Sequence, residues 1–341
     1  MISSCINVRT ILVTAFVCLM LSFQTIHAAD IEYPQTRIMA ATANHAGSVH
    51  VTALEKFAEI LEQESKGNVT VTLFTGGSKG DELDNVKQLR TGELQVAAVA
   101  TSDLAPFAPS ATITVLPYLF PEIEKAYTLF ENNNFITELG DRVAAESLTR
   151  PLGWMISDYR SLTNSKKPIT RIADLQGLKI RVPEVPIQLE LFRSWEVEPH
   201  PLAWSETVNA LEQGVVDGQV NPHSVNRDQK LWEVQKYVTD LHHMLWVGPL
   251  LVSERWYQNL EPNLKALIDR AARKAVAHQW QWADEQNRLA LQECLDNGMQ
   301  ITRLSDEHEW KARARALWPR FYRAVGGKEN IDRALEIMNT P

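Results

Sequence analysis

The sequence predicts an α/β protein with two domains arranged around a cleft. Short β-rich runs alternate with segments of helical periodicity along most of the chain, which is the pattern of parallel strands joined by helices. The chain has 341 residues, and a single domain typically holds about 100–200. Two α/β units in sequence therefore account for both the pattern and the length.

The first residues indicate export. Arg9 precedes an apolar run from Ile11 to Phe23, and small residues follow before the first acidic side chain. This order predicts a secretory signal peptide over residues 1–28, cleaved after Ala28 or Ala29. A membrane anchor is the alternative, but the apolar run is shorter than the ~20 residues that span a bilayer.

Charge and cysteine content exclude several classes of protein. The formal net charge is −8, and cleavage removes only Arg9, so the mature chain is more acidic still. Nucleic acid and anionic membrane surfaces are therefore not expected partners. Cys5 and Cys18 leave with the signal peptide, so Cys294 stands alone and no internal disulfide is possible. The fold must be held by its hydrophobic core.

The first α/β unit follows the signal peptide. Its predicted strands are 37–42, 69–74 and 95–100, and its predicted helices are 54–61 and 81–90. Strand, helix and strand in this order favour a parallel sheet, because parallel neighbours need a crossover connection.

The second unit begins near Gly153. Its predicted strands are 154–156, 178–182 and 215–217, with helices at 187–195 and 205–213. An apolar strand at 245–253 is expected to return to the first sheet, which gives two or more crossings and hence a hinge. We therefore expect lobe I to contain residues 29–152 and about 243–275, and lobe II residues 153–242.

The longest helical pattern runs from Pro262 to Gly298. At 1.5 Å per residue such a helix reaches roughly 50 Å, which exceeds one small domain. We expect this helix, 262–298, to brace both lobes. Further helices are expected over 305–341, beginning at Ser305 as an N-cap.

Enzyme motifs are missing from the sequence. It contains no Gly-rich phosphate loop, nucleophile elbow, paired-cysteine cluster or His-Glu-x-x-His helix. His242 and His243 are adjacent, but neighbours on a strand point to opposite faces and do not ligate one metal. The sequence thus favours a protein that is not an enzyme and holds no cofactor. No acidic cluster demands a metal, and whether a cation bridges a bound ligand stays open. An exported hydrolase or lyase with a basic histidine remains the alternative, and its candidate bases are His45, His50 and His223.

Basic and polar residues gather at strand ends of the second unit. Arg160, Arg181 and Asn221 are the main candidates, with Trp204 and His223 close in sequence. Arg181 ends an apolar strand before Pro183, and open α/β sheets place ligands at the carboxyl edge of their strands. A guanidinium there offers two parallel N–H donors that match a carboxylate. A surface salt bridge is the alternative role of Arg181.

Three long blocks carry a family resemblance. They are residues 160–169, 172–183 and 201–222, and weaker blocks lie at 57–59, 91–94 and 116–120, together with Gly80 and Glu82. In order and spacing these blocks closely resemble the solute-binding proteins of TRAP (tripartite ATP-independent periplasmic) transporters, the C4-dicarboxylate-binding superfamily.

The resemblance implies a fold, a function and a location. The fold is the two-lobed periplasmic binding protein fold, with two mixed sheets flanked by helices, a hinge, and a long helix bracing both lobes. The function is capture of a small organic acid anion, such as a dicarboxylate or a sugar acid, and its delivery to TRAP membrane subunits. The implied location is the periplasm, and we expect a monomer. A ligand-binding partner of a membrane sensor kinase, which shares the fold, is the alternative.

The resemblance also implies roles for single residues. Arg181 matches the arginine that makes the bidentate carboxylate contact, Asn221 matches a ligand-binding asparagine, and Arg160 matches an assisting arginine. The sequence departs from the family pattern at Val220, where glutamate is usual, and at 245–247, where histidine or tyrosine is often seen. Further contacts are expected from the residues His45, Glu82, Ser102, Trp204, His223 and Trp246.

Overall fold

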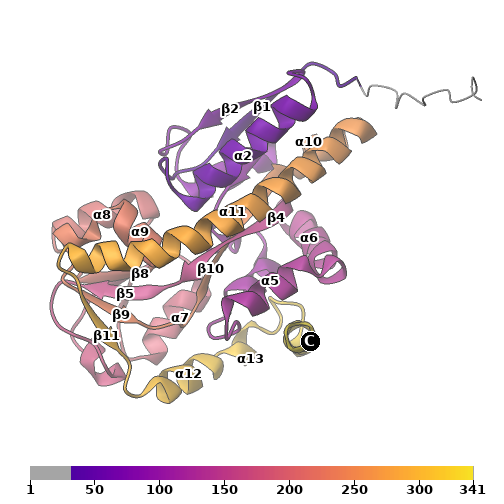
Figure 1. Ribbon diagram of the computed structural model, residues 1–341. Helices are drawn as coiled ribbons and strands as arrows, with labels where there is room; N and C mark the ends of the chain where they lie inside the picture. Colours follow the sequence, from indigo (N-terminus) through magenta and orange to yellow (C-terminus); the bar gives the residue numbers. More distant parts are fainter. Residues whose placement is uncertain (1–31, 341) are drawn as a thin grey trace, which may run out of the picture. The chain divides into compact units, whose positions relative to one another are not determined.

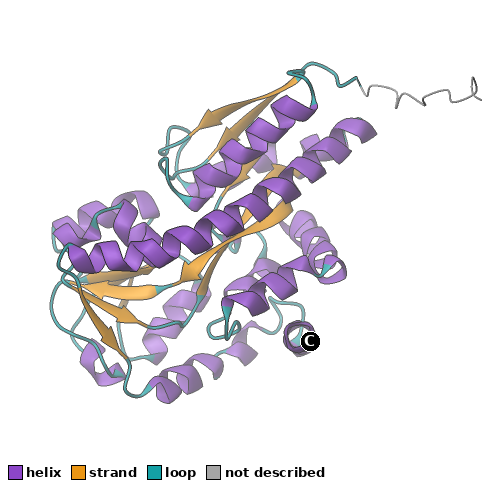
Figure 2. Cartoon of the chain, viewed as in Figure 1, coloured by secondary structure: helices purple, strands orange, loops and turns teal. Residues whose placement is uncertain are grey.

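The structure is a computed structural model that describes residues 32–340, so the predicted signal peptide and its cleavage site lie outside the described residues. Strands and helices alternate through it (Figures 1 and 2). The strands are β1 (Thr36–Ala41), β2 (Val69–Phe74), β3 (Val96–Ala98), β4 (Thr149–Tyr159), β5 (Ser161–Asn164), β6 (Ile180–Val182), β7 (Pro199–Pro201), β8 (Gly218–Asn221), β9 (Tyr237–Asp240), β10 (Leu245–Ser253) and β11 (Gln300–Arg303).

The helices are more numerous than the sequence patterns predict. They are α2 (Val49–Glu64), α3 (Glu82–Thr91), α4 (Thr101–Leu104), η1 (Pro109–Val115), α5 (Ile123–Glu131), α6 (Asn133–Ser147), η2 (Ile172–Leu175), α7 (Pro186–Ser194), α8 (Trp204–Glu212), α9 (His223–Asp228), η3 (Leu231–Glu233), α10 (Glu254–Gln258), α11 (Pro262–Asp296), α12 (Glu307–Arg315), α13 (Trp318–Phe321) and α14 (Lys328–Asn339).

The first sheet has five strands in the order β2-β1-β3-β10-β4. β1 pairs in parallel with β2 and β3, whereas β10 runs antiparallel to both β3 and β4. Every residue of β10 is buried, which fits a central strand covered on both faces. The predicted return of 245–253 to the first sheet is confirmed, and the sheet is mixed as expected. We call this sheet and the helices packed on it lobe I.

The second sheet has six strands in the order β11-β9-β5-β8-β6-β7. β6 is parallel to β7 and β8, while β5 runs antiparallel to β8 and β9. The predicted strand at 215–217 is wrong: these residues form the turn after α8, where Val215 donates to the carbonyl of Ala210, and β8 begins only at Gly218. We call this sheet and its helices lobe II.

The chain passes between the sheets at Arg160 and again at 241–244. β4 pairs with β10 over its whole length, so residues 153–159, predicted to open the second unit, instead belong to the first sheet. The two crossing segments are tied together, because the Arg160 N–H donates to the Met244 carbonyl at 2.8 Å. A third connection is α11, which packs against α2 and β4 in lobe I and α9 in lobe II (Figure 1). The predicted long helix is therefore present and contacts both lobes.

The free edge of β4 is closed by a helix side chain. Gln279 of α11 is fully buried; its side chain donates to the Ile156 carbonyl at 2.8 Å and accepts from the Ile156 N–H at 3.1 Å. Trp280 adds a bond from its indole N–H to the Trp154 carbonyl at 2.8 Å. One glutamine thus supplies the donor and acceptor that a sixth strand would otherwise provide, which satisfies backbone groups that burial would leave unpaired.

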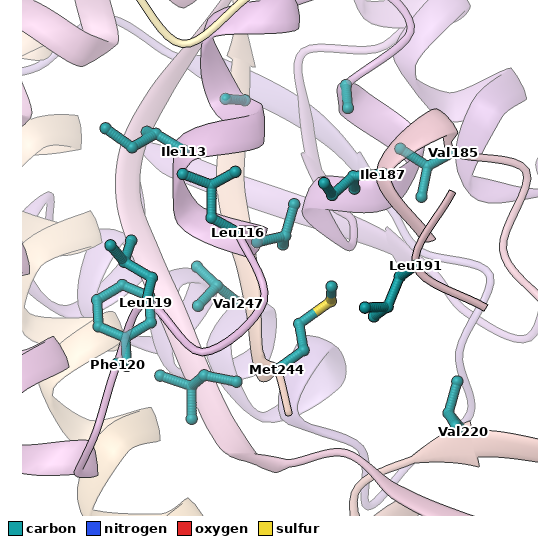
Figure 3. Packing of buried hydrophobic residues seen from close by; sticks show 14 of the residues in the cluster. Ile113, Leu116, Leu119, Phe120, Val185, Ile187, Leu191, Val220, Met244 and Val247 are labelled. Atoms are coloured by element: carbon teal, nitrogen blue, oxygen red, sulfur yellow. The ribbon is translucent and has the colours of Figure 1, made fainter. Parts of the chain in front are cut away.

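The hydrophobic core continues from one lobe to the other. Its main cluster includes Val247 and Leu116 in lobe I and Leu191 and Val220 in lobe II. Met244, from the crossing segment, lies within the same cluster (Figure 3). Because apolar packing reaches through the crossing, the region between the sheets is built as a core and not as a flexible linker.

Two further properties concern the described residues as a whole. Within residues 32–340 no helix combines the length and apolar character that a membrane crossing requires. In the same range no group of three or more His, Cys, Asp or Glu side chains is placed to hold a metal ion. Cys294 is buried and unbridged.

Replacement of Gln279 by alanine is expected to destabilise the fold. The change leaves the N–H and carbonyl of Ile156 buried without partners, at a cost of about 2–5 kcal/mol. Chemical denaturation measures the loss, and Gln292→Ala, at an exposed position of the same helix, is the matched control. Equal stabilities of the two variants would show that the glutamine does not close the strand edge.

Candidate functional site

Residues from the carboxyl ends of parallel strands in both sheets meet in one cavity. Asn44 follows β1, the segment from Ala100 to Asp103 follows β3, Arg181 lies in β6, and Asn221 ends β8. The cavity has a volume of about 40 Å³ and is lined by Asn44, His50, Glu82, Ala100, Ser102, Asp103, Arg160, Arg181, Pro183, Trp204, Asn221, Val225 and Trp246. Open α/β sheets place ligands at this edge because strand ends and helix starts present free polar groups there.

Arg181 is a buried, hydrogen-bonded side chain of the lobe II wall. It is 3% exposed, and its Nε and Nη2 donate to the Leu202 carbonyl at 3.0 and 2.7 Å. Its guanidinium carbon lies 5.7 Å from the centre of the Trp204 ring. Burial lowers the pKa of Arg181 to about 10, so the group stays charged at neutral pH. The carbonyl and the ring fix the direction in which this charge faces.

Arg160 lies beside it, at the crossing between β4 and β5. Its Nη1 donates to the Val220 carbonyl at 3.0 Å and to Asn221 Oδ1 at 2.7 Å, while its Nε is buried without a partner. Burial, and then the nearby charge of Arg181, lowers the pKa of Arg160 to about 9. Among the described residues, both guanidiniums donate only to neutral oxygen atoms.

Asn221 is held by a chain of side-chain hydrogen bonds. Its Oδ1 accepts from Arg160, and its Nδ2 donates to Gln219 Oε1 at 2.8 Å. Gln219 in turn donates to Thr163 and Asn226, both at 3.0 Å. These buried bonds fix the orientation of the amide and of the guanidinium it contacts.

The opposite wall, from lobe I, carries two buried carboxyl groups. Glu82 accepts from the Ala100 N–H and from Asn44 Nδ2, both at 2.6 Å. Asp103 accepts from the Ser102 hydroxyl at 2.9 Å. Burial raises the pKa of both groups, and the neighbouring Asp103 raises that of Glu82 further. The cavity therefore has a cationic wall facing an acidic one.

His50 and Trp246 complete the lobe I side. Burial lowers the pKa of His50 to about 3, so its ring is neutral. Its Nε2 lies 3.3 Å from a Glu82 carboxyl oxygen, and because the ring is neutral the two groups do not form an ion pair. Neither ring nitrogen has a hydrogen-bond partner among the described residues. The ring packs edge-on against Trp246, with centroids 4.9 Å apart.

Two predicted residues do not line the cavity. His45 packs against Gly76 and lines a neighbouring hollow. His223 lies at the start of α9, with its Nδ1 3.4 Å from the Ser161 hydroxyl. Arg160, Arg181 and Asn221 line the cavity together with the predicted residues Glu82, Ser102, Trp204 and Trp246. What these residues bind stays a prediction.

Sequence reasoning missed Asn44, His50 and Asp103. Asn44 and Asp103 follow predicted strands of the first unit, so the strand-end rule that selected Arg181 would have selected them also. His50 lies in the first turn of α2, and no sequence signal marked it as more than an alternative catalytic base.

A larger hollow of about 550 Å³ lies between α6, β4 and α11. Its partly buried Arg150 is already paired with Glu254 and Asp141 at 2.7 Å. The smaller cavity differs because its two buried cations lack a carboxylate contact within the described residues. Its donors can hold an anion, and its carboxyls can accept hydroxyl hydrogen bonds.

Comparison with known proteins gives relatives along almost the whole described chain. The model of a family described as bacterial extracellular solute-binding protein, family 7, matches residues 40–324. An uncharacterized protein of Sinorhizobium fredii is 32% identical over 236 residues, which span 67% of this chain and 42% of that relative's length.

Two solved structures show the same fold. A TRAP periplasmic solute-binding protein of Rhodobacter sphaeroides, in an open form without ligand, is 35% identical with a TM-score of 0.75 and covers 89% of this chain and 98% of its own. The sugar acid binding protein of Advenella mimigardefordensis, in complex with galactonate, is 25% identical with a TM-score of 0.84, over 90% and 99% of the two chains. The predicted fold and family are thus confirmed, and this chain belongs to the bacterial extracellular solute-binding proteins of family 7.

Proposed function

We propose that the protein captures a small organic acid anion in the periplasm and delivers it to the membrane subunits of a TRAP transporter. The observation that supports this most directly is the pair of buried guanidiniums, Arg160 and Arg181, whose hydrogen-bond acceptors within residues 32–340 are all neutral oxygens. The family and the export signal predicted over residues 1–28 support the location and the transport role.

The energetic argument starts from the cost of burial. Two like charges removed from water and placed beside each other destabilise the site unless an anion joins them. A ligand carboxylate offers two acceptor oxygens that match the free N–H groups, including the unpartnered Nε of Arg160. Each charge-assisted hydrogen bond contributes about 1.5–3 kcal/mol, so two or three of them account for tight binding.

The acidic wall restricts the rest of the ligand. An ionised carboxyl accepts from a ligand hydroxyl but repels a second ligand carboxylate, whereas a protonated carboxyl can donate to either. In their ionised form, Glu82 and Asp103 therefore favour a hydroxylated monocarboxylate over a dicarboxylate. Galactonate, which is bound in the structure of one relative, is a hydroxylated monocarboxylate. We propose the same class of ligand for this protein.

We infer binding without turnover. The histidine in the cavity, His50, is neutral and a weak base because burial lowers its pKa to about 3. His45 and His223, the other candidate bases, lie outside the cavity lining. General acid/base chemistry needs a base of matched pKa within reach of the reacting proton, and none of these three residues meets both conditions.

Arg181→Ala is expected to abolish high-affinity binding while the protein stays folded. Loss of two charge-assisted bonds corresponds to a weakening of about 100- to 10,000-fold. Isothermal titration with galactonate measures the affinity, and circular dichroism checks the fold. Arg193→Ala, an exposed arginine on α7, is the control and should bind normally. Unchanged affinity in folded Arg181→Ala protein rejects the proposed anion site.

Asp103→Asn is expected to reduce the discrimination between hydroxy acids and dicarboxylates. The wild type should show a larger thermal shift with galactonate than with succinate, because bound ligand stabilises by mass action. In the variant, the ratio of the galactonate affinity to the succinate affinity should be about ten-fold smaller than in the wild type. The contact with a galactonate hydroxyl weakens, and the charge that repels the second carboxylate of succinate is lost. A wild type that prefers succinate would contradict the proposed ligand class.

Glu82→Gln isolates a pH dependence of stability in the ligand-free protein. Burial raises the pKa of Glu82 in the folded protein. The protonated carboxyl therefore contributes to the free energy of unfolding below the unfolded-state pKa near 4.5, and this contribution is lost as the pH rises toward the folded-state pKa. The melting temperature of the variant minus that of the wild type should therefore increase as the pH rises above 4.5. A flat or falling difference would mean that the carboxyl is ionised in the folded protein without penalty.

A further inference from the structure

One carboxylate joins the two lobes at the rim of the cavity. Asp81 Oδ1 accepts from the Glu82 N–H at 2.6 Å and caps α3 in lobe I. Its Oδ2 accepts from the Ser205 hydroxyl at 2.6 Å, with the Ser205 N–H at 3.5 Å, in the first turn of α8 in lobe II. The same side chain therefore contacts the N-terminal turns of two helices, one from each lobe, where a negative charge is favoured.

The contact lies directly beside the ligand cavity. Glu82, the residue after Asp81, lines the lobe I wall, and Trp204, the residue before Ser205, lines the lobe II wall and packs against Arg181. Asp81 and Ser205 themselves line a separate hollow outside it, together with Gly80 and Trp204. A bond between these two residues thus sets the distance between the acidic and the cationic wall without touching the ligand.

We propose that Asp81 is a positioning residue that holds the two walls together by binding Ser205 whenever the lobes are closed. This rests on the proposed function, because closure matters only if the cavity captures a solute. The bond joins residues 124 positions apart in the sequence, and breaking it separates α3 from α8 at the rim. The contacts of the ligand within the cavity contribute to its affinity, while the bond between Asp81 and Ser205 slows reopening of the lobes.

The position of Asp81 is fixed by lobe I and does not depend on Ser205. Its loop is held by lobe I bonds alone: the Gly76 N–H donates to the Asn44 carbonyl and the Gly80 N–H to the Gly77 carbonyl, both at 2.9 Å. The cap of α3 uses Oδ1 and leaves Oδ2 for the partner lobe. Opening therefore costs lobe I none of its own hydrogen bonds, as a reversible contact requires.

Ser205→Ala removes the 2.6 Å hydroxyl bond to Asp81, retains only the long backbone contact, and leaves the α3 cap and the cavity-lining residues intact. Stopped-flow measurement with galactonate should show dissociation about three- to ten-fold faster, as expected for one charge-assisted bond at an exposed site, with little change in association. Ser205→Thr, which keeps a hydroxyl, should restore slow dissociation. Ser165→Ala, at the opposite end of β5 from the cavity, is the matched control and should behave as wild type.

Ligand-free protein separates this proposal from the proposed function. Small-angle X-ray scattering should show a larger radius of gyration for Ser205→Ala than for the wild type, because the open form gains population. If galactonate and related acids bind neither protein, the ligand proposal fails, and the scattering comparison still decides the role of Asp81. Identical scattering, or equally fast dissociation from Ser205→Thr, overturns the positioning role.

Discussion

The burial of two guanidinium groups beside each other is the constraint on which the rest of the site depends. Arg160 and Arg181 are each 3% exposed and repel each other. The protein surrounds them with carbonyl oxygens and the Asn221 amide, which solvate the charges without neutralising them. An internal carboxylate contact would stabilise the empty protein more, but it would compete with an anionic ligand. The neutral hydrogen-bond partners therefore leave the guanidiniums without a direct carboxylate contact, at a cost in stability, and this suits the anion site proposed here.

The position of Arg160 links this electrostatic constraint to the architecture. The residue stands at the point where the chain leaves the five-stranded sheet for the six-stranded one, and its N–H bonds the Met244 carbonyl on the returning segment. Its backbone thus belongs to the connection between the lobes, while its side chain belongs to the cavity. Under the proposed function, a force on the guanidinium would act directly on this connecting segment, and one residue would serve both ligand binding and lobe closure.

The sequence predicted the parts of the fold that depend on local pattern, such as β10 and the long helix α11, because an unbroken apolar run and a regular helical period are properties of the chain alone. It failed where pairing partners decide the outcome. Residues 153–159 have the composition of a strand in either sheet, and only the register with β10 places them in the first. In the site, Arg181 and Asn221 were predicted from strand ends and from the family resemblance. The environment of His50 arises from packing against Trp246, nearly 200 positions away in the sequence, and no local pattern encodes such a contact.

The acidic residues near the site divide by position into different roles. Glu82 and Asp103 face the arginines across the cavity, so the protonation of these carboxyl groups sets the charge opposite the guanidiniums. Asp81 precedes Glu82 by one position, but its carboxylate points along the rim, toward the start of α8. One short segment at the N-terminus of α3 thus provides both a residue of the cavity wall and a lobe-to-lobe contact. Because the two groups share a backbone, a shift of α3 moves both at once, and under the proposed function such a shift would couple the selection of the ligand to the stability of the closed form.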